Sequence, residues 1–127
     1  MSRPSTRARP WHAFMLGALL VAALAGCGGT TTNEVDMGIA TFQQDSVTIQ
    51  AGQTVHFADP ADGGGVHVLC IGQDLRCVPQ PGAPDALNGA GITFNPGDAR
   101  DIVFRTPGSY DIVCTIHPGM TVTLVVR

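Results

Sequence analysis

Residues 110–122 read Tyr-Asp-Ile-Val-Cys-Thr-Ile-His-Pro-Gly-Met-Thr-Val, and this stretch decides the fold. Single residues separate Tyr110, Ile112 and Cys114, so on a strand these three side chains share one face. The closing segment repeats the same two-residue period with Val122, Leu124 and Val126. The stretch therefore predicts two strands joined by a short turn, with a thiol presented inward where the first strand ends.

The two-residue period recurs through most of the upstream chain. The apolar residues that follow it are Val35, Met37, Ile39, Val47, Ile49, Val55, Phe57, Ile92, Phe94, Ile102 and Phe104. Turn residues separate these runs at roughly ten-residue spacing, and no stretch keeps a helical period. Cys70 to Gly91 is rich in proline and glycine, so we expect a loop there with at most one helical turn. The sequence predicts an all-β fold, a single Greek-key β-sandwich or barrel.

The turn within the opening stretch carries three metal-binding side chains at three-residue intervals: Cys114, His117 and Met120. A thiolate and a thioether suit copper, and the absence of a carboxylate from this turn argues against calcium or magnesium. Electron-transfer copper sites use two His and one Cys with a distant Met, so a second His is needed. His67 follows a glycine-rich loop and opens an apolar run, which makes it the candidate, whereas the strand phase of His56 predicts a surface position.

The cysteines favour a free thiol at position 114. Cys70 and Cys77 are close in sequence, so they can form a small disulfide that leaves Cys114 for a metal. Two alternatives remain open. In one, Cys114 pairs with Cys70 or Cys77 and the histidines are ordinary polar residues. The other is a closed tetrahedral zinc site formed by His67, Cys70, Cys114 and His117.

These motifs resemble the cupredoxin family of type 1 copper proteins, the group of plastocyanin, amicyanin and pseudoazurin. The resemblance covers residues 35–127 and rests on Cys-Thr-Ile-His-Pro-Gly-Met, on the upstream Gly-Val-His-Val, and on Val-Thr-Ile-Gln-Ala-Gly-Gln-Thr-Val. It implies one copper ion per chain, with Met120 as the weak axial ligand and three strong ligands, His67, Cys114 and His117. Relatives usually place Asn directly after the first His ligand, where this chain has Val68.

The resemblance also implies a carrier of single electrons between redox partners outside the cytoplasm, and not an enzyme. The residues agree, because the chain has no recognisable pair of catalytic carboxylates, no Ser-centred nucleophile motif and no phosphate-binding loop. Two other functions would use the same chain: storage or delivery of copper, and an adhesive β module with an incidental metal site. We expect the protein to be a monomer.

The N-terminal segment has the features of an export signal. Three arginines precede an apolar run that is too short to span a bilayer comfortably and that ends Leu-Ala-Gly-Cys at Cys27. That ending resembles a bacterial lipobox, which implies a signal peptide at 1–26, a lipidated Cys27 and attachment to a membrane of the cell envelope or periplasm. The alternative is an ordinary signal peptide that leaves Cys27 as a plain thiol. Residues 27–34 are expected to be a flexible tether to the domain at 35–127.

The charge of the chain restricts its partners. Removal of residues 1–26 takes away three of the seven basic residues and none of the ten acidic ones, so 4 minus 10 gives a net charge of −6, against −3 for the whole chain. The chain has no lysine, and four scattered arginines cannot form the basic face that nucleic acid requires. We expect a basic redox partner and no nucleic acid.

Overall fold

The computed structural model describes residues 33–127. The predicted signal peptide, Cys27 and most of the expected tether lie outside the described residues. Within them, no helical segment has the length and apolar character that a membrane crossing requires.

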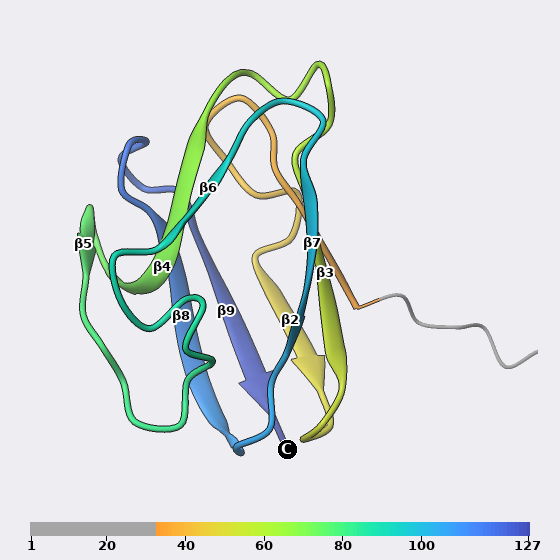
Figure 1. Ribbon diagram of the computed structural model, residues 1–127, viewed down its shortest axis with the longest axis vertical. Helices are drawn as coiled ribbons and strands as arrows, with labels where there is room; N and C mark the ends of the chain where they lie inside the picture. The colour runs from red at the N-terminus through yellow and green to blue at the C-terminus, as the bar shows by residue number, and fades with distance from the viewer. Residues whose placement is uncertain (1–32) are drawn as a thin grey trace, which may run out of the picture.

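Strands form the framework of the described chain. Their bounds are β1 Glu34–Asp36, β2 Ser46–Ile49, β3 Thr54–Ala58, β4 His67–Gln73, β5 Arg76–Cys77, β6 Ile92–Phe94, β7 Ala99–Val103, β8 Gly108–Cys114 and β9 Thr121–Val126. One sheet has the order β1-β3-β7, and the other has the order β2-β9-β8-β4-β5, with β6 paired to β4 (Figure 1). The prediction of an all-β fold is confirmed.

Both sheets contain parallel as well as antiparallel strand pairs. β1 runs parallel to β3 and β2 runs parallel to β9, whereas β8 pairs antiparallel with both β9 and β4. Several neighbouring strands are far apart in the chain, as in β2 and β9. Such long-range neighbours are typical of a Greek-key sandwich.

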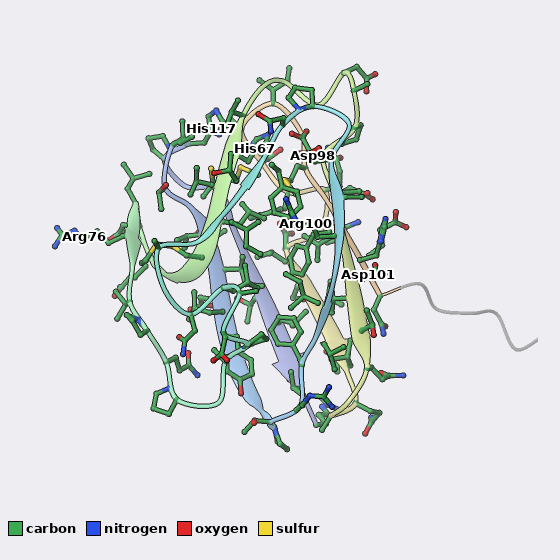
Figure 2. The ribbon with its side chains drawn as sticks, in the orientation of Figure 1. His67, Arg76, Asp98, Arg100, Asp101 and His117 are labelled. Atoms are coloured by element: carbon green, nitrogen blue, oxygen red, sulfur yellow. A yellow bond between two sulfur atoms is a disulfide. The ribbon has the colours of Figure 1, made fainter. Side chains whose placement is uncertain are left out.

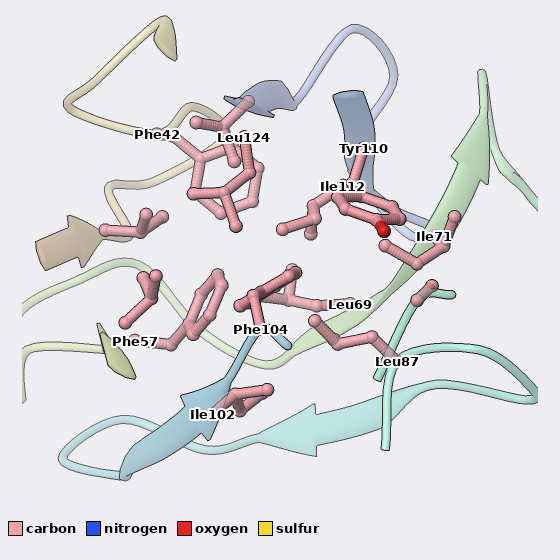
Figure 3. Close-up of a cluster of buried hydrophobic side chains, with 14 of the residues drawn as sticks. Phe42, Phe57, Leu69, Ile71, Leu87, Ile102, Phe104, Tyr110, Ile112 and Leu124 are labelled. Atoms are coloured by element: carbon pink, nitrogen blue, oxygen red, sulfur yellow. The ribbon is translucent and has the colours of Figure 1, made fainter. Parts of the chain in front are cut away.

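The core lies between the two sheets and is filled by the alternating apolar residues (Figure 3). Val55 and Phe57 are fully buried in the small sheet, and Ile112 is fully buried in the large one. Burying a side chain of this size stabilises the fold by about 1.5–3 kcal/mol. Tyr110 is also buried, and its hydroxyl donates a hydrogen bond to the Thr106 carbonyl at 2.8 Å, so its polar end is satisfied.

The prediction that Cys70 begins a loop is wrong, because β4 continues to Gln73. Cys70 pairs with Val113 of β8, and the chain then returns through the short strand β5. The apolar run of β4 therefore extends past the position where the sequence suggested a break. Residues 78–91 contain turns and no helix or strand.

Residues 78–91 run from β5 toward the end of the sandwich where β8 begins and then return to β6 (Figure 1). Leu87 is fully buried, and its carbonyl accepts a hydrogen bond from the Ile71 N–H at 2.8 Å. The side-chain amide of Gln80 donates to the Ser109 carbonyl at 2.9 Å. These hydrogen bonds fix the segment to β4 and β8.

The inward position predicted for Ile39 is also wrong. β1 ends at Asp36, and Ile39 is 72% exposed in the following turn. The turn is closed by a hydrogen bond from the Gly38 N–H to the Thr41 carbonyl at 2.7 Å. A three-residue strand followed by a turn cannot keep the alternation through position 39.

Candidate metal centre

Two antiparallel strands bring the predicted ligands to one end of the large sheet. Cys114 is the last residue of β8, and His67 is the first residue of β4. The register pairs Leu69 with Cys114, so the start of β4 lies beside the end of β8. Strand pairing therefore joins two residues that are 47 positions apart in the chain.

The turn between β8 and β9 brings the other two predicted ligands to the same end. The Cys114 N–H donates to the Met120 carbonyl at 3.0 Å, and the Met120 N–H donates to the His117 carbonyl at 3.2 Å. Gly119 has a φ of 77°, in the left-handed region that favours glycine, which permits this tight return. Met120 is buried, with 1% of its surface exposed.

Three donor atoms converge at this end. The ligand atoms of His67, Cys114 and His117 lie within 4.8 Å of one another. Cys114 Sγ is 3.8 Å from His67 Nδ1 and 3.5 Å from His117 Nδ1. Figure 2 shows both imidazoles together at this end of the sandwich. His67 and Cys114 are fully buried, whereas His117 is half-buried.

The cysteine pairing in the structure decides between the alternatives left by the sequence. Cys70 and Cys77 form a disulfide, and Cys114 is the free cysteine of the described chain. The alternative in which Cys114 pairs with another cysteine is wrong. The zinc alternative is also wrong, because it needs a thiolate from Cys70.

Burial controls the protonation of His67. Desolvation lowers the pKa of its imidazole, and the neighbouring His117 lowers it further, while the nearby Asp59 carboxylate raises it. A ligand imidazole must be neutral at the nitrogen that binds the metal. Burial therefore keeps His67 in the form that can coordinate.

Sequence reasoning missed Asp59, which lies in the loop that precedes His67. Only 1% of its surface is exposed, and its Oδ1 lies 4.0 Å from His67 Nε2. Burial raises the pKa of this carboxyl group. An Asp before Pro60 in a glycine-rich loop is typical of an exposed turn, so the local sequence carries no signal of burial.

Val68 occupies the position at which relatives usually have Asn. Its carbonyl accepts a hydrogen bond from the Thr115 N–H at 2.9 Å. This bond joins the strand that follows His67 to the turn that follows Cys114. A link between the two ligand segments is therefore made here by backbone atoms.

The surroundings of His56 agree with the surface position expected for it. Its side chain is 39% exposed and lies 2.6 Å from the Asp101 carboxylate on the neighbouring strand β7. His56 is not among the residues that converge with Cys114.

The donor set fits copper. Two imidazoles and a free thiol converge, a thioether is buried at the same end, and the cluster contains no carboxylate. Soft sulfur donors combined with imidazoles select copper over oxygen-preferring cations. These features define a small β-sandwich protein of the type 1 copper class.

Comparisons with known proteins agree with this class. No protein-family model matches the chain. The chain is 33% identical to plastocyanin of Scenedesmus fuscus over 84 residues, which are 66% of this chain and 82% of that protein. Its fold is similar to amicyanin of Paracoccus versutus, with a TM-score of 0.55 and 22% identity over 77% of this chain and 83% of the other. A reduced Cu(I) form of an amicyanin variant at pH 4 gives the same TM-score, with 74% and 80% of the two chains covered.

The chain belongs to the cupredoxin family, to which plastocyanin also belongs. The predicted family is confirmed, and with it the cupredoxin type of β-sandwich. Plastocyanin and amicyanin are electron carriers and not enzymes, which supports the prediction that the chain is not an enzyme.

Proposed function

We propose that this protein carries single electrons between redox partners outside the cytoplasm, through one type 1 copper ion held by His67, Cys114, His117 and Met120. The observation that carries the proposal is the free, buried Cys114 thiol with an imidazole Nδ1 atom at 3.8 Å and another at 3.5 Å. The bound ion would supply the one-electron couple.

The framework suits a carrier because it fixes the donors before the electron moves. β4 and β8 hold His67 and Cys114 through backbone pairing, and the hydrogen bonds of the turn hold Met120. A frame that changes little between the two oxidation states keeps the cost of reorganisation low. His67, Cys114 and Met120 are each at most 1% exposed, so water is kept from most of the centre.

The half-buried His117 is the proposed exit for the electron, because it is the most exposed of the four ligands. The candidates for an apolar rim around it are small or apolar residues of the two adjacent loops: Ala61, Gly63 to Gly65, Pro118 and Gly119. Gly63 is buried and does not belong to such a rim. Exposed apolar side chains extend it at Ile39, Val66 and Ile116, which are 72%, 43% and 49% exposed.

This rim is the proposed docking surface for redox partners. Ile39 reaches it because its backbone and side chain contact Gly64 in the loop that leads to His67. A few large apolar side chains around one half-buried imidazole suit brief contacts, as electron transfer requires small and short-lived interfaces. The predicted charge of −6 on the exported chain would favour basic partners.

Electron self-exchange between oxidised and reduced copies tests the rim without a known partner. Ile116→Asp is expected to slow self-exchange, measured by NMR line broadening, because a hydrated carboxylate then lies beside His117. Val78→Asp is the matched control: Val78 is 53% exposed, and it lies directly after β5, outside the rim. Equal slowing by both variants would indicate a general charge effect and contradict the rim.

Voltammetry and a chelator test the carrier itself. The copper-loaded protein is expected to cycle reversibly by one electron and to retain Cu(I) against a moderate chelator. Loss of Cu(I) to the chelator without reversible cycling would instead indicate storage or delivery of copper.

The proposed location is the cell envelope, with residues 1–26 removed as a signal peptide, Cys27 lipidated, and residues 27–34 as the connection to a monomeric domain at 35–127. The last residue of this connection, Glu34, already belongs to β1. The lipobox supports the anchor, and a disulfide is typical of proteins outside the cytoplasm. Mass measurement on protein extracted from membranes tests the lipid. A soluble wild-type protein with an unmodified Cys27 would contradict the anchor.

A further inference from the structure

The ring of His67 stands between the free thiol and a buried carboxylate. Its Nδ1 atom is 3.8 Å from Cys114 Sγ, and its Nε2 atom is 4.0 Å from Asp59 Oδ1. His67 is 0% exposed and Asp59 is 1% exposed. Within the described part of the chain, neither carboxylate oxygen of Asp59 has a hydrogen-bond partner, and Nε2 has none in bonding geometry. The Gly63 backbone is the other polar group close to the ring, near enough to raise the pKa of the imidazole. Burying such groups without partners is unfavourable, so their arrangement requires an explanation.

Hydrogen bonds to both the backbone N–H and the backbone carbonyl of Asp59 hold this residue in position. Its N–H donates to the Asp98 carbonyl at 2.8 Å, and its carbonyl accepts from the Gly97 N–H at 2.7 Å. Both bonds come from the turn between β6 and β7. The residue directly after β3 is therefore fixed against that turn, with its side chain directed into the same end of the core as His67.

Gly63 leaves the space that the carboxylate occupies. A Cβ atom at this position would meet Asp59 Oδ1, and it would lie 2.8 Å from the Pro60 carbonyl. Gly63 has an ordinary φ, since it is absent from the residues with positive φ. A side chain at position 63 would therefore take the space that Asp59 occupies, and it would not require an unusual backbone conformation.

We propose that Asp59 is a positioning residue for the metal centre: its carboxylate accepts the Nε2 proton of His67 and thereby keeps the Nδ1 lone pair directed at the metal. The inference rests on the proposed function, because it takes His67 as a ligand. The 4.0 Å separation exceeds a hydrogen bond by about 1 Å, so a small side-chain shift or one water bonded to both groups completes the contact. A carboxylate behind a ligand imidazole fixes both the tautomer and the orientation of the ring.

Two substitutions of Asp59 distinguish the effect of its hydrogen-bond acceptor from the effect of its negative charge. Asp59→Asn keeps an oxygen acceptor of the same shape, whereas Asp59→Leu keeps the volume and removes the acceptor. Asp62→Leu is the matched control, because Asp62 is an exposed carboxylate of the same loop. All are made in the full chain.

Nitrogen-15 NMR of the metal-free protein reports which ring nitrogen of His67 carries the proton. We expect protonation at Nε2 in the wild type, in Asp59→Asn and in the control, and a shift of the proton toward Nδ1 in Asp59→Leu. Copper affinity, measured by competition with a chelator, is expected to fall by about 10- to 100-fold in Asp59→Leu. A purely structural role for Asp59 would change stability and leave the tautomer unchanged.

An unchanged tautomer and copper affinity in a folded Asp59→Leu protein would overturn the inference. If that variant does not fold, Gly63→Ala replaces it, because the added methyl group displaces the carboxylate; an unchanged His67 tautomer there would overturn the inference equally. The proposed function fails in a different way. A wild-type protein that binds no copper through Cys114 contradicts the function itself, whereas a wild-type copper–thiolate centre with an unaffected Asp59→Leu variant contradicts only the role of Asp59.

Discussion

The disulfide between Cys70 and Cys77 is expected to stabilise the fold without contributing to the metal centre. The two residues are 7 positions apart, and closing a loop of that length in the unfolded chain is worth about 2.4 kcal/mol at 25 °C. Cys70 is also fully buried, so Cys70→Ala with Cys77→Ala adds about 1 kcal/mol of lost packing. The double variant should therefore lose about 3 kcal/mol of unfolding free energy, or roughly 10–25 °C in Tm.

Urea unfolding of the metal-free protein measures this loss. Cys77→Ala alone is the matched control, because it opens the ring and keeps the buried sulfur of Cys70, so about 2.4 kcal/mol of the loss should remain. The visible spectrum of the copper-loaded double variant should be unchanged. Cys114 pairs with Leu69 and shares its face, whereas the next residue, Cys70, lies on the opposite face of β4. A loss below about 1 kcal/mol would refute the loop-closure reasoning, and a lost copper band would refute the independence of the two sites.

Leu87→Ala should lower the unfolding free energy by about 2–5 kcal/mol, because Leu87 is fully buried, and it should leave copper binding intact; impaired copper binding would show that residues 78–91 affect the metal end. The metal-free protein should lose stability as the pH falls through about 6.5, because burial lowers the pKa of His67 and the unfolded chain then binds the additional proton. His67→Gln should remove this part of the pH dependence in urea unfolding, and an unchanged dependence would contradict the assignment. Hydrogen bonds from Asn95 lower the pKa of Asp98, so the stabilisation by its carboxylate should be present above about pH 4 and lost in stronger acid. Asp98→Asn should flatten the stability curve in that acid range, and a curve identical to that of the wild type would exclude this contribution.

The sequence was sufficient for the features that depend on periodicity. Alternation placed Val55, Phe57 and Ile112 in the core, and it placed Cys114 on the inward face of a strand end. The convergence of His67 with this thiol could be anticipated because only a few histidines were available and a copper site needs a second imidazole.

Features that depend on tertiary contacts could not be read from the sequence. The continuation of β4 through Cys70 depends on its pairing with β8, and the exposure of Ile39 depends on where β1 ends. The burial of Asp59 depends on the turn at Gly97, which lies in another segment, and on the space left by Gly63 in its own loop. A local pattern in an Asp-Pro loop cannot report either contact.

The central claim is that the Cys114 thiolate binds copper together with two imidazoles. The visible absorption spectrum of the copper-loaded protein, compared with that of Cys114→Ala, tests it most directly. We predict an intense thiolate-to-copper band in the wild type and its complete loss in the variant. A colourless wild-type protein, or a band that persists in Cys114→Ala, would contradict the claim.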